Sequence, residues 1–285
     1  MSLIIENLYK TYGKKNVLNN ISVNFQAEKI YGLLGNNGAG KSTLLNIINN
    51  RIFDTKGKIT LDGRLIAENE KSLNNIHLMS EDDLYPSKLK IKSLFHLIEG
   101  FYGDFDWRLA NEMLSEFELE PTKRMNKLST GYRSITKLII ALCVPCEYIF
   151  LDEPVLGLDA NHRELFYNYL IETYQENPRT FVISTHLIEE ISNLLEKVII
   201  LDKGKIIKDD SVENILENTY IVTGSIEEVE TFTDQLQILE KTTLGGSLTA
   251  FVKGELPQNK MGNIKVESMS LQDYFMKIAS KKKGN

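Results

Sequence analysis

Eight residues near the N-terminus combine glycines, a lysine and a serine at a spacing that suits phosphate binding. Residues 35–42 read Gly-Asn-Asn-Gly-Ala-Gly-Lys-Ser and fit the pattern G-x-x-x-x-G-K-[ST]. An apolar run, Ile30–Leu34, predicts a strand before them, and the residues after them predict a helix. Glycines let backbone N–H groups curl around phosphate oxygens, and a helix N-terminus adds more donors. The residues expected to bind the phosphates of ATP are Gly35, Asn36, Asn37, Gly38, Ala39, Gly40, Lys41, Ser42 and Thr43.

Two acids after a second apolar strand have the residue types needed to bind Mg²⁺ and to activate water. Residues 148–151 predict a buried strand that ends in Asp152 and Glu153. The carboxyl ends of strands in an open α/β sheet are where ligands bind. Lys41 would neutralise the β- and γ-phosphates, while Ser42 and Asp152 would hold Mg²⁺. Glu153 would polarise the water that attacks the γ-phosphate, so the two motifs together indicate a nucleotide phosphohydrolase or kinase.

A short polar stretch narrows the class. Residues 128–132, Leu-Ser-Thr-Gly-Tyr, lie between the phosphate loop and the acidic strand. Here the chain resembles the ATP-binding-cassette (ABC) ATPases, whose signature in this place is L-S-G-G-Q. The resemblance covers residues 3 to about 218 and implies ATP hydrolysis coupled to transport across a membrane.

The resemblance also implies roles for further residues. Tyr12 is similar to the aromatic residue that stacks on adenine, Asp159 to a loop aspartate at the dimer interface, and His186 to the histidine that contacts the γ-phosphate. It further implies that Ser129 and Gly131 serve the ATP held by Lys41 of a second ATPase subunit, either an identical copy or a paralogue. ATP would close this two-fold dimer and hydrolysis would release it.

One position departs from the family pattern. The family usually has a glutamine between the phosphate loop and the helical region, and it touches Mg²⁺ and signals to the membrane subunit. This chain has no glutamine between Gln26 and Gln175, and Glu81 occupies the expected position. A carboxylate still ligates Mg²⁺, but it adds negative charge beside a polyphosphate. We expect Glu81 to keep the coupling role and to weaken nucleotide affinity.

The elements that must position these residues alternate between strand and helix over most of the chain. This alternation predicts an α/β fold with a mainly parallel sheet covered on both faces. With the resemblance, it indicates a P-loop NTPase core with an antiparallel β subdomain and a helical subdomain. The expected division is an ATPase domain at 1–217, with its helical subdomain at about 88–130, and a small α+β accessory domain at 218–285 that includes a final amphipathic segment, residues 271–278.

Composition restricts the partners. The net charge is −6 and the pI about 5.4, which argues against nucleic acid as the main partner. The N-terminus lacks the pattern of a secretory signal, and the longest apolar run, residues 138–144, is too short to span a bilayer. We therefore expect a cytoplasmic protein, peripheral on the inner face of the membrane, that works with a separate membrane-spanning subunit. Cys143 and Cys146 are expected to be structural.

Three functions remain to be compared. Residues 105–107 and 271–275 are similar to segments of exporter ATPases that move drugs, peptides or lipids, and this favours an exporter. A cassette acting on DNA or ribosomes would usually carry two cassettes, a long coiled coil or zinc modules, and none is visible here. A sensor without turnover is disfavoured because Lys41, Glu153 and His186 are all present. The terminal lysines, 281–283, fit a solvated tail better than a lipid contact.

Overall fold

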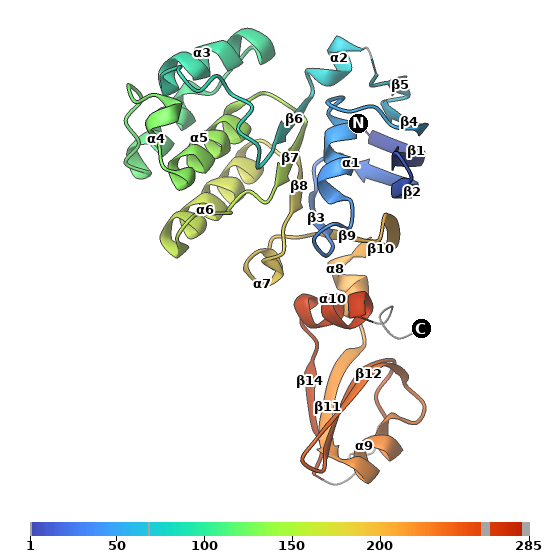
Figure 1. The fold of residues 1–285 in the computed structure, drawn as a ribbon. Helices are drawn as coiled ribbons and strands as arrows, with labels where there is room; N and C mark the ends of the chain where they lie inside the picture. Colours follow the sequence, from blue (N-terminus) through green and yellow to red (C-terminus); the bar gives the residue numbers. More distant parts are fainter. Residues whose placement is uncertain (1, 68, 258–262, 281–285) are drawn as a thin grey trace.

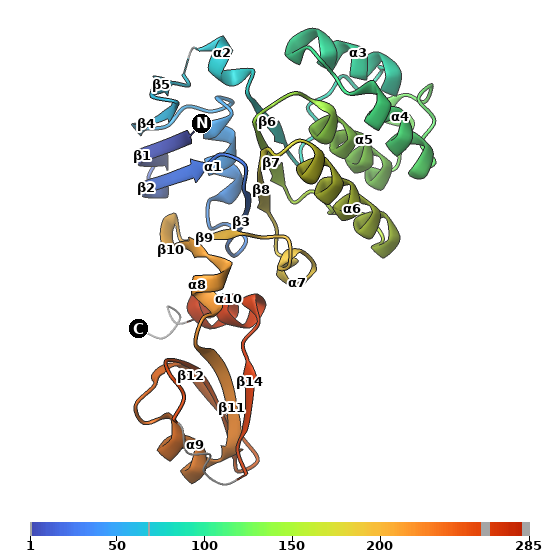
Figure 2. The same ribbon diagram turned by 180° about the vertical axis from the view of Figure 1, so that it is seen from behind.

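The described residues form three β-sheets with helices packed on and between them (Figure 1, Figure 2). The computed structural model describes residues 2–67, 69–257 and 263–280, and the lysines at 281–283 lie outside this part. The third sheet lies beyond the other two, at the end of the molecule that holds β11, β12 and α9.

The central sheet is the predicted parallel one. Its five parallel strands and one antiparallel edge strand follow the order β10 (Lys205–Ser211), β9 (Lys197–Asp202), β3 (Ile30–Leu34), β8 (Thr180–Ser184), β7 (Tyr148–Asp152) and β6 (Ile76–Met79). Strands β3, β6, β7 and β8 are buried along their whole length. Helix α1 (Lys41–Ile48) covers one face, while α5 (Thr130–Cys143) and α6 (Ala160–Glu176) cover the other (Figure 1). The α/β prediction is confirmed.

An antiparallel sheet packs over α1. It follows the order β2 (Lys15–Gln26), β1 (Ser2–Tyr12), β4 (Lys56–Leu61) and β5 (Arg64–Leu65), and the short helix α2 (Glu70–Leu73) follows β5 in the chain. The ring of Phe25 meets Tyr31 edge-on at a centroid distance of 5.2 Å and Phe150 at 5.8 Å. These contacts join the antiparallel sheet to the central one, since Tyr31 lies on β3 and Phe150 on β7.

A helical region projects from the other face of the central sheet. It contains α3 (Ile91–Tyr102), α4 (Trp107–Glu116) and a 3₁₀ turn (Met125–Lys127), and it packs against α5. The apolar face of α4, with Ala110, Met113 and Leu114, is buried. Asp106 caps α4 by accepting a hydrogen bond of 2.9 Å from the Leu109 N–H.

The C-terminal residues form a third sheet with its own core. After α7 (Ile188–Ile191) and α8 (Val212–Leu216) come β11 (Thr219–Ser225), α9 (Ile226–Thr233), β12 (Gln237–Leu244), β13 (Ser247–Lys253) and β14 (Lys265–Ser268). Val222, Val229 and Phe232 belong to a cluster separate from the main cores. The boundary at 217/218 remains a prediction.

The last helix, α10 (Leu271–Ser280), contacts the central core as well as β12 of the accessory sheet, where Lys277 Nζ pairs with Glu240 at 2.8 Å. Its residues Leu271 and Tyr274, and Met269 before it, are buried in the same cluster as the central core, next to α7 and α8. Leu271 and Tyr274 are spaced i, i+3 and share one face of the helix. The accessory sheet is therefore attached to the core at both of its ends.

No helix in the described ranges is long and apolar enough to cross a bilayer.

The packing of α10 predicts that Tyr274→Ala destabilises the contact of α10 with α7 and α8. Removing a ring that is 5% exposed should lower the free energy of unfolding by about 3 kcal/mol. Hydrogen exchange should increase in α7, α8 and α10 and stay unchanged in α9. Met276→Ala is the matched control, since Met276 lies on the same helix and is 54% exposed. Faster exchange in α9 alone would contradict this packing.

Candidate functional site

The chemistry-bearing loops converge because their strands are neighbours. Strands β3, β8, β7 and β6 run parallel and side by side, so their carboxyl ends share one edge of the sheet. The phosphate loop follows β3, and His186 follows β8. Asp152 ends β7 with Glu153 next to it, and Glu81 follows β6. Sequence-distant residues thereby meet at the edge where open α/β sheets bind ligands.

A hollow of about 640 Å³ opens at this edge. Its lining contains most of the predicted phosphate and metal residues together with cations that sequence reasoning missed. The lining residues are Lys15, Asn16, Val17, Asn37, Gly38, Ala39, Gly40, Lys41, Ser42, Thr43, Glu81, Asp152, Glu153 and Lys203. Gly35 and Asn36 lie in the same loop, where their carbonyls accept hydrogen bonds from the Lys41 Nζ (2.7 Å) and the Ala39 N–H (3.0 Å).

Lys41 is the central cation of the hollow. Its side chain is buried, and burial lowers the pKa of its ammonium, while the carboxylates of Glu153 and Asp152 raise it. A buried charge needs partners, and here they are one carbonyl and two carboxylates. Polyphosphate oxygens would be stronger acceptors than the Gly35 carbonyl.

The backbone around Lys41 is shaped as a cradle. Gly38 has φ 78°, and a Cβ placed on it would meet no atom within 4 Å, so the space above the loop is open. Helix α1 begins at Lys41 without a side-chain cap on its first N–H groups. Uncapped N–H groups at a helix N-terminus bind anions readily. The loop therefore fits the phosphates that the sequence predicts.

Asp152 and Ser184 leave buried oxygens unsatisfied beneath this cradle. In the described part of the chain, neither Asp152 Oδ1 nor Ser184 Oγ has a hydrogen-bond partner. An unsatisfied buried acceptor costs about 1–3 kcal/mol, and Asp152, which lines the hollow, thus has an oxygen available to bind a cation there. Ser42, Glu81 and Asp152 line the hollow and offer the oxygen donors that Mg²⁺ prefers.

No cluster of three His, Cys, Asp or Glu side chains able to hold a metal alone exists among the described residues. Mg²⁺ in phosphoryl-transfer sites needs only one or two protein carboxylates, because substrate phosphates and water fill the remaining positions. The donor set therefore fits a cation that is shared with a nucleotide.

Glu153 and His186 form a contact pair beside Asp152. His186 Nδ1 lies 2.9 Å from Glu153 Oε2, and the Glu153 N–H donates to the Ser184 carbonyl at 2.8 Å. Glu153 has φ 48°, in the left-handed region that non-glycine residues rarely adopt. Such strain persists where the surroundings enforce it, and it gathers at functional sites. The loop between β7 and α6 thus holds the predicted base in a fixed position.

A second hollow, of about 330 Å³, is lined by the predicted nucleotide-binding residues that follow the signature pattern. Ser129, Gly131 and Asp159 line it and do not line the first hollow. Ser129 caps α5 by accepting from the Tyr132 N–H at 3.2 Å, and Asp159 caps α6 by accepting from the His162 N–H at 3.0 Å. A Cβ on Gly131 would lie 3.0 Å from the Gly157 carbonyl oxygen, so glycine permits the two loops to approach.

Tyr12 is not brought to the first hollow. It ends β1 with 48% of its surface exposed, and the Lys10 ammonium lies 4.7 Å from its ring centroid. Lys15, its partner across the β1–β2 turn, lines the hollow instead. The role of Tyr12 at adenine remains a prediction.

Lys203 was missed because its position depends on tertiary contacts. It lies in the β9–β10 turn, where the Gly204 N–H donates to the Ala39 carbonyl at 2.9 Å. A Lys-Gly pair after a strand is an ordinary turn signal. Only the place of β9 beside β3 brings this turn to the phosphate loop.

The two cysteines lie away from this edge. Cys143 and Cys146 are free and buried, and burial raises the pKa of both thiols, that of Cys146 to about 12. A protonated, buried thiol is inert. Cys143 borders a hollow of about 350 Å³ between α4, α5 and α6, where Arg179 donates to the Leu142 carbonyl at 2.8 Å. Arg179 thereby satisfies the last carbonyls of α5.

Comparison with known proteins finds relatives that are ATP-binding proteins of transport systems. A family profile described as ABC transporter matches residues 18–156. The ABC transporter ATP-binding protein YtrB of Bacillus subtilis (strain 168) is 30% identical over 213 residues, which are 75% of this chain and 71% of that protein. The petrobactin import ATP-binding protein YclP of the same strain is 30% identical over 250 residues, covering 85% and 97%. The lantibiotic transport ATP-binding protein SrtF of Streptococcus pyogenes is 30% identical over 223 residues, covering 75% and 94%.

Solved structures share the fold. An ATP-binding subunit of an ABC transporter superposes with a TM-score of 0.69 at 22% identity, covering 75% of this chain and 92% of that one. A dimeric ATP-binding cassette in a post-hydrolysis state, bound to ADP and phosphate, gives a TM-score of 0.66 at 24% identity, covering 74% and 98%.

The position of Lys41 predicts that Lys41→Met weakens ATP binding. Losing a charge-assisted hydrogen bond to phosphate costs about 1.5–3 kcal/mol, or roughly 10- to 100-fold in the dissociation constant. Equilibrium binding of a fluorescent ATP analogue measures this change. Lys58→Met is the control, because Lys58 is exposed and, within the described part of the chain, pairs only with Glu6 at the surface. Equal affinities of the two variants would remove Lys41 from the site.

Proposed function

Because this chain belongs to the family of ABC transporter ATP-binding proteins, which are ATPases, we propose that it powers a separate membrane-spanning subunit through ATP-driven closure of an ATPase dimer. One observation carries the proposal. The phosphate loop with its acids and the signature loop with Asp159 line two separate hollows of the same chain. Phosphoryl transfer needs charge neutralised on every side of the γ-phosphate, and the first hollow leaves one side open.

The residues of the first hollow would then act as follows. The backbone from Gly35 to Gly40 cradles the phosphates, and Lys41 neutralises the developing charge. Mg²⁺, when bound to Ser42, Asp152 and Glu81, supplies Lewis-acid stabilisation of the phosphate oxygens. Glu153 accepts the proton of the attacking water.

His186 supports this step from its contact with Glu153. At 2.9 Å from the Glu153 carboxylate, the Nδ1 of His186 would fix the direction of that group. The strained backbone of Glu153 keeps the carboxylate in place without rearrangement.

The second hollow would serve the partner subunit. Ser129 and the N-terminal N–H groups of α5 would contact the γ-phosphate held by the partner, and Asp159 would lie at the interface. A two-fold dimer forms two equal sites from this one arrangement. Closure by ATP and release after hydrolysis shift the population between two states, and this shift is the mechanical output.

The membrane partner and the direction of transport are the finer part of the proposal. SrtF is described as a lantibiotic transport protein and YclP as a petrobactin import protein, so relatives of equal identity differ in cargo. The similarity of residues 105–107 and 271–275 to exporter ATPases favours export of peptides, drugs or lipids from the inner face of the membrane.

The role of Glu153 predicts that Glu153→Gln abolishes turnover but not binding. Removing a general base lowers kcat by roughly 10²- to 10⁴-fold. ATP affinity should be unchanged or tighter, because one negative charge leaves the hollow. Phosphate release and equilibrium binding, measured on the same preparation, separate the two effects. Turnover within threefold of wild type would refute the catalytic assignment.

The shared-site arrangement predicts that two inactive variants restore activity when mixed. Lys41→Met inactivates the first hollow and Ser129→Arg the second. A mixed dimer has one intact site, made from the phosphate loop of one chain and the signature of the other. If chains exchange freely, half of the dimers are mixed, so about a quarter of wild-type activity should return. Mixing Lys41→Met with Glu153→Gln is the control, because both changes inactivate the first hollow. No recovery in the first mixture would show that each site is complete in one chain.

A further inference from the structure

The segment that carries Glu81 into the first hollow is held by two cations, one from helix α5 and one from the residues that follow helix α1. It comprises residues 80–83, Ser-Glu-Asp-Asp, directly after β6. Lys137 approaches it from α5, the helix that begins at the signature, and Arg51 approaches it from the residues after α1, the helix of the phosphate loop. Neither cation lines the hollow itself.

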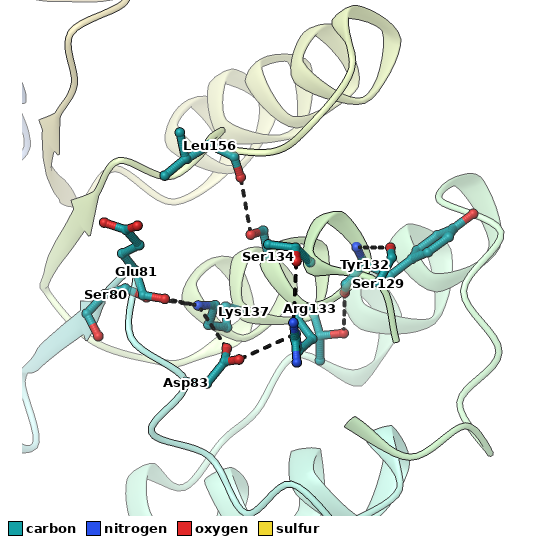
Figure 3. Close-up of polar contacts among 11 residues, drawn as sticks. Ser80, Glu81, Asp83, Ser129, Tyr132, Arg133, Ser134, Lys137 and Leu156 are labelled. Atoms are coloured by element: carbon teal, nitrogen blue, oxygen red, sulfur yellow. Dashed lines mark hydrogen bonds and ion pairs between the residues drawn. The ribbon is translucent and has the colours of Figure 1, made fainter. Parts of the chain in front are cut away.

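Lys137 is a buried ammonium whose hydrogen bonds all go to this segment. The residue is 4% exposed, and its Nζ donates to the Ser80 carbonyl at 3.1 Å and to the Glu81 carbonyl at 2.8 Å (Figure 3). The same Nζ lies 3.5 Å from Asp83 Oδ1. A buried ammonium is tolerated only when its N–H groups find acceptors, so this geometry strongly favours one conformation of the segment.

Arg51 holds the first residue of the same segment and the strand β6 that precedes it. Its guanidinium donates to Ser80 Oγ at 3.0 Å and to the Leu78 carbonyl at 2.8 Å. Asp83 is also paired with Arg133 of α5 at 3.4 Å. The segment is thus fixed at one end to the phosphate-loop side of the protein and at the other to the signature helix.

The backbone carbonyl and the side-chain carboxylate of Glu81 point in different directions. Its carbonyl faces Lys137, while its carboxylate points away from that lysine (Figure 3). The carboxylate belongs to the residue that lines the hollow beside Lys41, Ser42 and Asp152. A shift of α5 would therefore move the Glu81 carboxylate relative to the nucleotide.

Helix α5 also reaches the catalytic loop. The buried Ser134 Oγ donates to the Leu156 carbonyl at 3.4 Å, and Leu156 lies three residues after Glu153 (Figure 3). Ser129 caps the same helix. One rigid helix thus contacts the segment of Glu81, the loop of Glu153 and the surface proposed to meet the partner's nucleotide.

We propose that Lys137 is a positioning residue that sets where the Glu81 carboxylate lies in the nucleotide hollow. The affinity for the divalent cation–ATP complex then depends on the position of α5, the helix that begins at the signature residues 128–132. This inference rests on the proposed place of Glu81 in the site. Lys137 touches neither nucleotide nor cation and acts through the backbone of residues 80 and 81.

Lys137→Met tests the proposal, with ATP binding measured in the non-hydrolysing Glu153→Gln background. The ratio of the dissociation constant in EDTA to that in Mg²⁺ measures how much Mg²⁺ strengthens ATP binding. This ratio should fall about tenfold, because one charge-assisted hydrogen bond contributes about that much to affinity. The affinity in EDTA should stay within about twofold. Amide hydrogen exchange of residues 80–83 in the nucleotide-free protein should become faster. Lys137→Arg, which keeps donors and charge, should recover much of the Mg²⁺ effect.

Lys123→Met is the matched control, because Lys123 is an exposed lysine of the same helical region and its one ion pair among the described residues is with Glu120. It should leave all three measurements unchanged. If Lys137→Met does not fold, Lys137→Gln, which keeps an N–H donor, replaces it in every comparison.

A double-mutant cycle with Glu81→Gln decides whether Lys137 acts through Glu81. The Lys137→Met effect on the Mg²⁺ ratio should largely disappear in the Glu81→Gln background. An equal effect in both backgrounds, or an equal loss of affinity with and without Mg²⁺, would overturn the proposal. If Glu81→Gln leaves ATP affinity and its Mg²⁺ dependence unchanged while Glu153→Gln still abolishes hydrolysis, the inference fails and the proposed function stands.

Discussion

The buried ammonium of Lys41 at the carboxyl edge of the central sheet is the charge around which the rest of the structure is arranged. It is desolvated, and its nearest acceptor is the Gly35 carbonyl at 2.7 Å. A cation in this position is stable only if acidic groups lie near it, and Asp152 and Glu153 at the end of β7 supply them. These groups need a support that does not move. The fully buried strands β3, β7 and β8, packed between α1 on one face and α5 and α6 on the other, provide it.

The sequence predicts local structure well where pattern and chemistry agree. The strand at 30–34 has the expected bounds, and the phosphate loop lies between β3 and α1 as its pattern requires. Strands β10, β12 and β14 escaped prediction because β10 is only half-buried and β12 and β14 are mainly exposed, so none has a clear apolar alternation. Strands β10 and β12 form by hairpin pairing with β9 and β13, and β14 pairs with the sequence-distant β11. The amphipathic pattern of α10 predicts a helix, but it does not tell which core its apolar face meets.

The site shows the same limit. Each motif predicts a contact with phosphate or cation, while the order β3-β8-β7-β6 that unites the motifs is a tertiary fact. Lys203 and Lys15 enter the hollow through turns whose sequences are ordinary. Lys137 lies in a helix between buried apolar residues, where its neighbours Ile135 and Leu138 predict core packing. Nothing in the spacing of α5 indicates that an ammonium there would bind the backbone of residues 80 and 81. Functional residues that act through backbone contacts leave no motif.

The charges in the first hollow favour a nucleotide site that a second subunit completes over a site formed by one chain alone. Its lining holds three lysines, Lys15, Lys41 and Lys203, against three carboxylates, Glu81, Asp152 and Glu153. Before any ligand arrives the two sets roughly cancel, so a triphosphate adds charge that these side chains alone do not offset. A divalent cation would supply part of the missing positive charge, and the carboxylates would bind it. The N-terminus of a helix capped by Ser129, brought by a second subunit, supplies a further positive end of a dipole. Glu81, where the family usually has a neutral glutamine, increases the deficit. Under the proposed function, a chain with this residue would therefore depend more strongly on the cation and on the partner's helix, and both requirements would meet at residues 80–83.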